Sequence, residues 1–416
     1  MRKAALAAAA VLLLAAGGLA AFLLYDRHAE RDVRGSSTAE FVPTETVTRP
    51  TFRRVQGIVW PFFGYDEARN HVAPATRLRP PFRRLWVAGG RSLLEFPPAI
   101  AFGRLYLANG AGTVYALAAK TGARAWAYRS NRCTAASPAV GPYQRGTVYE
   151  TFLNRGRCPS KRPGDGLVAA LAVGDGAVRW TRRIGASETS PLVVGHRVFV
   201  GDWLGKVYAL DSRTGRLLWS YRTGGAIKGG AALSRGRLYV GSYDGNLYAL
   251  NAATGRLVWK SSSVGRLFGH GTFYSTPSVA YGRVYIGSTD HKVYSFGATS
   301  GKLRWSHSTG SYVYASPAVW RKLVLVGSYD HTFYAFDAAT GAERWSFRAA
   351  GPISGSATVV NGVVYFAALA GRTYGLDART GRLLWSFPDG RYSPVVADRR
   401  RLYLLGYSAV YGLVPR

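Results

Sequence analysis

Short apolar runs recur along most of the chain, and turn-forming residues separate them. One unit contains four such runs, namely Ser316-Pro-Ala-Val, Leu323-Val-Leu-Val-Gly, Thr332-Phe-Tyr-Ala-Phe and Arg344-Trp-Ser-Phe. The runs are rich in β-branched and aromatic residues, and Asp-His or Thr-Gly turns lie between them, which is typical of antiparallel strands. After residue 30 the sequence has no extended helical period. The pattern therefore predicts a unit that folds as one four-stranded antiparallel sheet.

The unit is repeated, and a tryptophan ends each copy. A clear copy runs from Gly205 to Trp219 and contains Ala209, Asp211 and Thr214-Gly215. Counted from Trp86, the tryptophans of the repeat are spaced by 40, 54, 39, 40, 46, 40 and 40 residues. This period, with four strands in each unit, indicates a β-propeller, and the tryptophans are expected to dock one blade against the next. The predicted docking residues are Trp86, Trp126, Trp180, Trp219, Trp259, Trp305, Trp345 and Trp385.

The number of blades follows from the inner-strand pattern, which is Ser-Pro or a variant of it. The pattern occurs eight times, near Pro97, Ser137, Ser190, Gly230, Thr276, Ser316, Ser356 and Ser393. The last copy ends at Arg416 without an outer strand, whereas Arg84-Leu-Trp-Val stands unattached before the first inner strand. Joining the two removes two open sheet edges. The sequence therefore predicts an all-β, eight-bladed propeller that is closed by its N-terminal outer strand.

These motifs resemble those of a known family. The run Ala-x-Asp-x-x-Thr-Gly-x-x-x-Trp is similar to the tryptophan-docking repeat of pyrroloquinoline quinone (PQQ) propellers and of BamB-like propellers. The stretch from Trp60-Pro-Phe-Phe-Gly-Tyr-Asp to Trp86 is similar to the segment that precedes the first blade in quinoprotein-like chains. The resemblance covers residues 58–416. It implies the fold, and it leaves open whether the chain binds PQQ.

The N-terminal residues differ from the repeat. Arg2 and Lys3 precede an apolar run from Ala4 to Leu24. A run of about 20 apolar residues suits a membrane-spanning signal-anchor better than the 7–15 residues of a cleaved signal core, although cleavage remains an alternative. We therefore predict a signal-anchor and transmembrane helix over residues 1–25, a linker over 26–57 and the propeller over 58–416. The positive-inside tendency then places the propeller outside the cytoplasm of a single-pass membrane protein.

The charge of the chain is strongly basic. The 416 residues include 54 Lys and Arg against 22 Asp and Glu, which gives a formal net charge of +32. Two explanations stay open, an Arg-rich composition without a functional meaning and attraction to an anionic partner. Lys120, Arg213 and Arg379 are among the residues that place positive charge at the Thr-Gly turns. Because the outer strand at Trp86 starts on that side, we expect the anchor to approach the propeller there.

The two cysteines are 25 residues apart. Cys133 precedes the inner strand of the second blade, and Cys158 lies in the lengthened loop between the second and third strands of that blade. Export would place both in an oxidising compartment, and both loops leave the same face of the ring. The sequence therefore predicts a disulfide between Cys133 and Cys158.

Residues for catalysis or metal binding are not found. PQQ dehydrogenases are expected to hold the cofactor with a disulfide of adjacent cysteines, a calcium ion and an Asp base, and the separated cysteines do not match this arrangement. Asp211, Asp337 and Asp377 occupy turn positions, where a side-chain cap is the simpler role. The seven histidines form no cluster with metal-ligand spacing. We therefore predict no catalytic residue, no metal site and no cofactor, with PQQ implied by the resemblance alone.

A binding surface is expected at one mouth of the central channel. The position two residues before each Ser-Pro, or its equivalent, should surround this mouth, and its residue type varies from blade to blade while the scaffold is uniform. Trp203 lies in a neighbouring loop of the same face. The candidate residues are Glu95, Glu188, Lys228, Tyr274, Tyr314, Ser354, Arg391 and Trp203. They are interpreted either as a binding site or as a solvated rim.

Three functions are compatible with these sequence features. The leading hypothesis is a monomeric, membrane-anchored, extracytoplasmic scaffold that binds a protein or an anionic envelope component, as in envelope assembly. The alternatives are a PQQ-dependent oxidoreductase and a receptor for anionic cell-wall polymers. Nucleic acid is not expected as a partner, because the chain carries no recognition motif.

Overall fold

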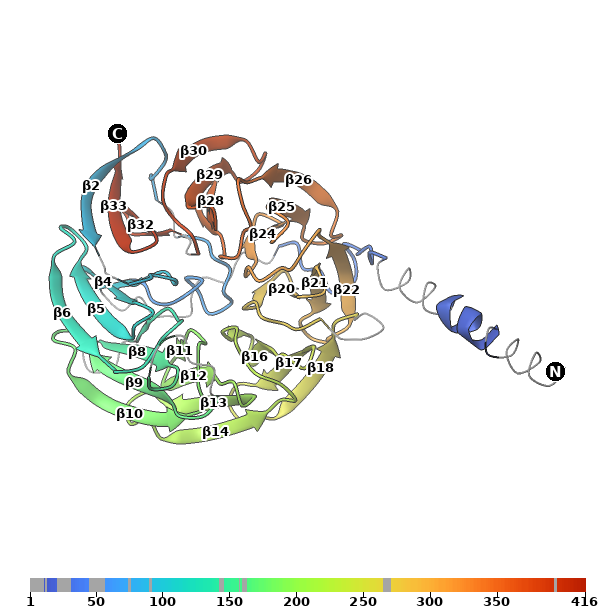
Figure 1. Ribbon diagram of the computed structural model, residues 1–416, viewed down its shortest axis with the longest axis horizontal. Helices are drawn as coiled ribbons and strands as arrows, with labels where there is room; N and C mark the ends of the chain where they lie inside the picture. The colour runs from blue at the N-terminus through green and yellow to red at the C-terminus, as the bar shows by residue number, and fades with distance from the viewer. Residues whose placement is uncertain are drawn as a thin grey trace.

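The described strands form eight antiparallel sheets arranged as a ring around a central axis (Figure 1). The computed structural model describes residues 11, 13–20, 31–44, 57–73, 76–89, 92–141, 146–156, 158, 163–264, 271–392 and 395–416. Each sheet is one blade, and its strands run in order from the axis to the rim. The predicted eight-bladed propeller of four-stranded blades is therefore confirmed, with one additional inner strand in blade 1.

The first four blades contain the strands β1 and β3 to β18. Their bounds are β1 (Ile58–Trp60), β3 (Ala99–Ala101), β4 (Arg104–Ala108), β5 (Thr113–Ala118) and β6 (Arg124–Arg129) in blade 1; β7 (Ala139–Gly141), β8 (Thr147–Phe152), β9 (Gly166–Ala172) and β10 (Val178–Ile184) in blade 2; β11 (Leu192–Val194), β12 (Arg197–Gly201), β13 (Lys206–Asp211) and β14 (Leu217–Arg222) in blade 3; and β15 (Ala232–Ser234), β16 (Arg237–Gly241), β17 (Asn246–Asn251) and β18 (Leu257–Ser262) in blade 4.

The other four blades contain the remaining strands. Their bounds are β19 (Ser278–Ala280), β20 (Arg283–Gly287), β21 (Lys292–Gly297) and β22 (Leu303–Ser308) in blade 5; β23 (Ala318–Trp320), β24 (Leu323–Gly327), β25 (Thr332–Asp337) and β26 (Glu343–Arg348) in blade 6; β27 (Thr358–Val360), β28 (Val363–Ala368), β29 (Arg372–Asp377) and β30 (Leu383–Phe387) in blade 7; and β31 (Val396–Ala397), β32 (Leu402–Leu405), β33 (Ala409–Pro415) and β2 (Phe82–Gly89) in blade 8.

Blade 8 combines the two ends of the repeat region. β2 pairs antiparallel with β33, from Phe82 opposite Pro415 to Gly89 opposite Ala409. Figure 1 shows the two strands side by side, blue against red. This pairing supplies the outer strand that the last repeat lacks and leaves no sheet edge open between the ends. The predicted closure by the strand around Trp86 is confirmed.

Tryptophans and glycines hold adjacent blades together. Seven of the predicted tryptophans lie over the turn glycine of the next blade, which follows a threonine in five cases, and a Cβ added at Gly215 would lie 2.6 Å from the Trp180 ring. The Trp180 indole N–H also donates to the Ser212 carbonyl at 3.0 Å. Gly215 has φ of +71°, a conformation that glycine adopts without strain. Trp385 differs, because it packs edge-on against Phe82.

The serines of the Ser-Pro pattern have a structural role at the start of the inner strands. The Ser316 hydroxyl accepts the Thr276 backbone N–H at 3.0 Å, and the Ser356 hydroxyl accepts that of Ser316 at 2.9 Å. Thr276 in turn accepts the Gly230 N–H at 2.8 Å. Each hydroxyl thus joins its own blade to the preceding one. Hydrogen bonding to a buried neighbouring backbone explains why the pattern repeats at the axis.

Two segments outside the repeat are also built into the ring. Residues 57–73, here called the axial plug, run along the central axis, and residues 31–44, here called the N-terminal strap, lie against blade 5. In the strap, Val33 bridges Ser306 of the outer strand β22, and Glu40 pairs with Arg304. Residues 31–44 of the predicted linker over 26–57 thus hydrogen-bond to the ring, while residues 26–30 and 45–56 lie outside the described residues.

The strap also changes the expected route of the chain. Asp32 accepts the backbone N–H of Ser308 at 2.7 Å, and the Ser300 backbone N–H donates to Glu40 at 3.1 Å. The Ser300-Gly301 turn precedes β22 and Ser308 ends it, so the strap follows β22 from its end at Ser308 back to that turn. Among the described residues of the strap, the chain contacts the ring at blade 5 before it reaches Trp86. Residues 21–30, which join the predicted anchor to the strap, lie outside the described residues, so the side from which the anchor approaches stays a prediction.

The N-terminal residues are described only in part. Val11 and residues 13–20 are helical, while residues 1–10, 12 and 21–30 lie outside the described residues. Within the described part of the chain, no helix is long and apolar enough to cross a membrane. The predicted transmembrane helix therefore lacks support from the structure.

Candidate binding site at the channel mouth

The axial plug closes the central channel. Its carbonyl groups accept backbone N–H donors from several inner strands: Pro61 from Val140, Glu67 from Leu233, Ala68 from Val279, Asn70 from Val319 and His71 from Val359. Strand β1 adds to the inner strand of blade 1 through the pair Trp60 and Ile100. Since this segment bonds to six blades and its Phe62, Arg69 and Asn70 side chains are fully buried, the described residues fill the axis below the mouth. The mouth is therefore a pocket with a floor.

Arg69 fixes the plug from within. Its side chain is fully buried, and it donates to the carbonyls of Ala231 at 2.9 Å and of Ser190 and Pro191 at 3.2 Å. It also donates to the Phe63 carbonyl of the plug itself. Burial lowers the pKa of Arg69 to about 9, so the guanidinium remains charged at neutral pH. The arginine thus satisfies four carbonyls that the closed ring shields from water.

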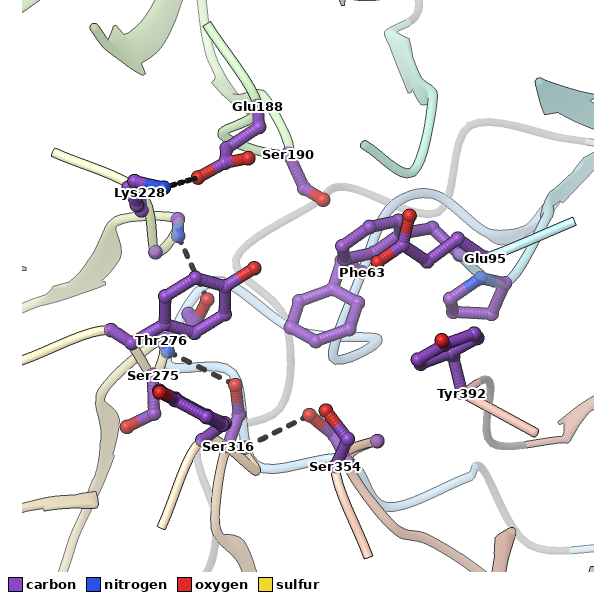
Figure 2. Close-up of a pocket in the computed structure, with 18 residues that line it drawn as sticks. Phe63, Glu95, Glu188, Ser190, Lys228, Ser275, Thr276, Ser316, Ser354 and Tyr392 are labelled. Carbon is purple, nitrogen blue, oxygen red and sulfur yellow. Dashed lines mark hydrogen bonds and ion pairs between the residues drawn. The ribbon is translucent and has the colours of Figure 1, made fainter. Parts of the chain in front are cut away.

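The pocket above the plug encloses about 570 Å³, including space that is open to solvent. Phe63 of the plug forms part of its floor, as Figure 2 shows. Around it lie side chains from the loops that enter the inner strands of blades 1, 3, 4, 5, 6, 7 and 8. The lining includes Phe63, Glu95, Phe96, Pro97, Glu188, Ser190, Lys228, Tyr274, Ser275, Thr276, Tyr314, Ser316, Ser354, Ser356 and Tyr392. This mixture of apolar and polar groups is typical of a ligand pocket.

Two carboxyl groups and one ammonium group carry the charge of the lining. Lys228 Nζ lies 3.2 Å from Glu188 Oε1, and their side chains are 23 % and 10 % exposed. Burial raises the pKa of Glu188, and the Lys228 charge opposes that change. Burial, together with the negative charge of Glu188, raises the pKa of Glu95 to about 7. Glu95 therefore exchanges its proton close to neutral pH.

Aromatic rings form one wall of the site. Lys228 Nζ lies 4.6 Å from the centre of the Trp203 ring, 5.1 Å from that of Tyr243 and 5.8 Å from that of Tyr274. The Tyr274 ring contacts Tyr314 at a centroid distance of 5.0 Å. These distances fit cation–π interactions, in which a positive charge is attracted to the face of a ring. The wall therefore favours positive groups.

The structure brings most of the predicted site residues together. Glu95, Glu188, Lys228, Tyr274, Tyr314 and Ser354 all line the pocket. Trp203 is not part of the lining, but it contacts Lys228 from behind. Arg391 lies beside the pocket, with its guanidinium 5.3 Å from the Tyr407 ring centre. Tyr392, the next residue, takes the place that was predicted for Arg391. That these residues bind a ligand stays a prediction.

Several lining residues were missed by sequence reasoning. Phe63 belongs to the plug, which has no counterpart in the repeat. Phe96 and Tyr392 each follow a predicted position by one residue, and the irregular spacing before the last inner strand shifts the register. The aromatic run Trp60-Pro-Phe-Phe is a signal for Phe63, because such a run outside the repeat needs an apolar partner.

Other candidate groups lie away from the pocket. Cys133 and Cys158 form the expected disulfide, with their Cα atoms 5.5 Å apart, and Cys133 packs with Leu153 and Ala186 near Trp203. No group of three or more potential metal ligands is present among the described residues. Asp211, Asp337 and Asp377 cap the Thr-Gly turns, as the hydrogen bonds from Thr214, Thr340 and Thr380 show.

Comparisons with known proteins agree with this architecture. The profile of the family described as outer membrane protein assembly factor BamB matches residues 83–202, 204–315 and 297–411. The serine/threonine-protein kinase AfsK of Streptomyces griseus is 33 % identical over 154 residues, which cover 34 % of this chain and 18 % of the kinase. The chain thus matches less than a fifth of that relative's length.

Solved structures share the fold at low sequence identity. BamB from Moraxella catarrhalis has a TM-score of 0.64 at 19 % identity and covers 80 % of this chain and 100 % of its own. Quinohemoprotein alcohol dehydrogenase from Comamonas testosteroni has a TM-score of 0.72 at 14 % identity, with 88 % of this chain and 82 % of that chain covered. A europium-containing methanol dehydrogenase has a TM-score of 0.69 at 14 % identity, with 86 % and 91 % covered. Because the family profile matches most of the chain, this protein belongs to the BamB family of PQQ-like β-propellers.

Proposed function

We propose that this protein is a non-catalytic binding and scaffold module of the cell envelope, and that it holds a protein partner at the mouth pocket. One observation carries the proposal: a pocket with a floor, lined by different side chains from seven blades, lies on a scaffold that is otherwise uniform. Variation confined to one repeat position is expected where a surface recognises a ligand. The description of the matched family as an assembly factor supports a scaffold role.

An extracytoplasmic, membrane-anchored location is part of this proposal. The apolar run from Ala4 to Leu24 after Arg2 and Lys3 is long enough to span a bilayer as a helix. The disulfide between Cys133 and Cys158 supports an oxidising compartment, because such bonds are rare in the cytosol. A C-terminal alkaline phosphatase fusion should be active, and the intact chain should stay in the membrane fraction after carbonate extraction. A cytoplasmic, inactive fusion would contradict this location.

PQQ-dependent oxidation is the alternative suggested by the dehydrogenases that share the fold. PQQ carries three carboxylates, whereas the pocket contributes two carboxyl groups and one lysine that is already paired with Glu188. Burial raises the pKa values of Glu95 and Glu188, and the negative charge of Glu188 adds to the rise at Glu95, so a third source of negative charge would be disfavoured there. The lining of this pocket does not fit that cofactor. The same charges argue against an anionic polymer at the mouth.

Site-specific photocross-linking in cells tests the proposed function. The cross-linking residue p-benzoylphenylalanine replaces Tyr312, which is exposed beside Tyr314 at the mouth, or Arg379 on the turn face as the matched control. We expect a discrete protein adduct from position 312 and none from position 379. The adduct should vanish in the variant Ser354→Trp, which fills the pocket, provided that this variant unfolds at the wild-type temperature. Equal adducts from both faces, or persistence in the filled variant, would contradict the proposal.

A further inference from the structure

The face of the ring opposite the mouth is here called the turn face, because it carries the turns between the third and fourth strands of the blades. In blade 3, β14 begins at Leu217 directly after such a turn and ends at Arg222. From there the chain enters the loop with Lys228, which lines the mouth pocket. The two ends of an outer strand therefore belong to opposite faces. The proposed function uses only the mouth and assigns no role to the turn face.

Exposed basic side chains surround the turn face. They come from the turns themselves and from the neighbouring loops between first and second strands, such as that of Lys322, whose carbonyl accepts the Ala338 N–H at 2.8 Å. Among the described residues, seven of the eight blades contribute such a side chain, namely Lys120, Arg216, Arg256, Lys302, Lys322, Arg382 and Arg400. The capping aspartates Asp211 and Asp377 each share their turn with two arginines, so these turns stay net positive. A face of this charge attracts anionic surfaces.

Apolar side chains are exposed beside these cations. Seven of them lie one or two positions before a docking tryptophan, in the half of an outer strand nearer to the turn face, namely Leu85, Val178, Leu217, Leu218, Leu257, Val258 and Leu383. Blades 3 and 4 repeat one arrangement, Arg216-Leu217-Leu218 and Arg256-Leu257-Val258. Figure 1 shows their outer strands β14 and β18 next to each other on the rim. Exposed apolar side chains that recur on adjacent blades indicate an interaction surface.

The opposite ends of these two strands are different. β14 ends with residues 220–222, and β18 (Leu257–Ser262) ends with residues 260–262. Neither of these ends contains an exposed large apolar side chain, although Arg222 and Lys260 are exposed. Positive charge is therefore present at both ends of the outer strands in blades 3 and 4, but its combination with exposed leucines is confined to the turn-face end.

We propose that the turn face docks on the surface of a bilayer that contains anionic lipids, with its arginines at the headgroups and Leu217, Leu257 and their neighbours at the boundary with the acyl chains. A lipid surface offers negative charge and an apolar layer next to each other, whereas a dissolved anionic polymer would leave the leucines in water. Arginine suits this boundary, because its stem covers apolar surface while its guanidinium stays in the polar layer. The mouth pocket is then turned away from the bilayer.

This inference goes beyond the mouth partner and uses the proposed N-terminal anchor only as a tether. The ten residues 21–30 between the apolar run and the strap can span at most about 35 Å. The six residues of β22, along which the strap lies, measure about 20 Å. The tether thus allows either face of the ring to reach the bilayer, and the surface chemistry of the two faces decides between them. A tether also raises the local concentration of the face at the bilayer, so a weak attraction is sufficient.

Site-specific fluorescence quenching tests the orientation on the full chain. Both native cysteines form the disulfide, so a new cysteine is the one thiol available for labelling with the fluorophore NBD. Ala253→Cys places it in the exposed turn before β18, and Ser262→Cys places it at the other end of that strand. The protein is reconstituted in nanodiscs of phosphatidylcholine, with or without phosphatidylglycerol, that carry a quencher on the headgroups.

We expect quenching at position 253 to be about twofold stronger than at position 262 in the anionic discs, and to fall towards the same low level in neutral discs or in about 1 M salt, where the screening length is about 3 Å. Equal quenching at the two positions in the anionic discs, or stronger quenching at position 262, would overturn the inference. This comparison needs no change to the basic or apolar residues of the surface.

Paired substitutions test the role of the charges. Arg216→Gln combined with Arg256→Gln removes two cations from the turn face and should weaken docking about tenfold. Arg129→Gln combined with Arg222→Gln removes the same charge from the other ends of β6 and β14, and it should leave docking unchanged. All four positions are exposed, and thermal unfolding checks that both variants fold. Equal weakening by the two pairs would show that net charge alone acts, and would contradict the turn face as the docking surface.

A further pair separates a lipid surface from an anionic polymer. Leu217→Ser combined with Leu257→Ser keeps every charge, so it should weaken docking on a bilayer but not on a polymer. Docking that needs the arginines and is unaffected by this pair would contradict the lipid. If the cross-link from position 312 fails while quenching at position 253 persists, the mouth partner is wrong and the docking inference stands. The reverse result would leave the proposed function intact and overturn the docking.

Discussion

The axial plug and the N-terminal strap both lie outside the repeat, and in each an arginine donates to several backbone carbonyls, but the arginine belongs to the segment in one case and to the ring in the other. In the plug, Arg69 belongs to the segment and donates to the blade carbonyls of Ser190, Pro191 and Ala231. In the strap, Arg283 belongs to blade 5 and donates to the strap carbonyls of Ser36, Ala39 and Glu40. Hydrogen bonds from an arginine to backbone carbonyls therefore fix the plug inside the ring and attach the strap to its outside.

The difference lies in what happens when each contact opens. The strap lies on the outside of blade 5, so Arg283 and its carbonyl partners would be hydrated if the strap detached. The plug is enclosed by the ring, so Arg69 and its partners cannot reach water without opening the blades. An unpaired buried polar group costs far more than one that exchanges its partner for water. The plug is thus expected to be part of the folding unit, and the strap a separable attachment.

The largest expected effect is that of Arg69→Ala. This change leaves the carbonyls of Ser190, Pro191 and Ala231 without their donor inside the ring, and breaking such a buried charged network costs about 3–5 kcal/mol. The matched change Arg283→Ala should cost about 1–2 kcal/mol, because its partners become hydrated. Urea unfolding of the two variants measures both values. A loss for Arg283→Ala equal to that for Arg69→Ala would contradict the distinction between plug and strap.

The next largest effect is the pH dependence of the unfolding free energy that arises from Asp66 in the plug. Burial raises the pKa of Asp66 from 3.8 to about 6, although hydrogen bonds from Asn70 oppose the change. The unfolded chain loses this proton near pH 4 and the folded chain only near pH 6, so stability contributed by Asp66 falls as pH rises between these values. The change should be on the order of 3 kcal/mol.

The variant Asp66→Asn isolates this effect. Other carboxyl groups titrate in the same range, so the informative quantity is the difference in unfolding free energy between wild type and variant at pH 4.5 and at pH 6.5. We expect the variant to gain stability relative to wild type at the higher pH. A difference that is the same at both values would show that Asp66 is hydrated, and that the plug is more open than the structure indicates.

The smallest expected effect is that of the strap carboxylate. Burial raises the pKa of Glu40, but hydrogen bonds from Ser300 and Arg304 outweigh burial and hold it below 4.5. Stability from this pair is therefore present above pH 4.5 and is lost as pH falls through the folded-state pKa. Glu40→Gln should cost about 1 kcal/mol or less, since the pair is partly exposed.

Hydrogen exchange distinguishes the two segments directly. The backbone N–H groups of Gly35 and Val42 donate from the strap to Thr340 and Tyr281, and that of Ala73 donates from the plug to Val359. At pH 4 and in high salt, the backbone N–H groups of Gly35 and Val42 should be less protected against exchange than at neutral pH and low salt, while the protection of the Ala73 N–H should not change. The variant Glu40→Gln should give fast exchange of the strap already at neutral pH. Equal protection of all three amides in every condition would contradict a separable strap.

The predictable part of this fold consists of contacts between neighbouring blades. Trp180 contacts Gly215 and Ser212, and a similar offset recurs from blade to blade. The spacing of the tryptophans therefore predicts the propeller architecture. The pairing of β2 with β33 was predictable for a related reason, since one repeat lacked the strand that stood free at the other end. The mouth positions followed once the inner strands were placed.

The plug and the strap were not predictable in this way. Arg69 contacts carbonyls that lie 121 to 162 residues away, and Arg283 contacts carbonyls about 243 to 247 residues away. Neither contact recurs from blade to blade, so no regular spacing in the sequence predicts it. The sequence around residues 31–44 predicts a linker because it mixes charged residues with Ser, Thr and Pro and has no apolar period. Arg304 and Lys292 supply partners for its carboxylates only in the folded ring.

The sequence by itself determined the eight blades, their closure and most of the positions around the mouth, because each depends on strand patterns and on contacts that repeat at one fixed offset. The tertiary structure alone decided that the channel is closed, that Phe63 forms the floor of the pocket and that Glu95 titrates near neutral pH. These properties arise from burial and from charges brought together across the ring. Such interactions depend on distance in space, which a single sequence does not encode at any regular spacing.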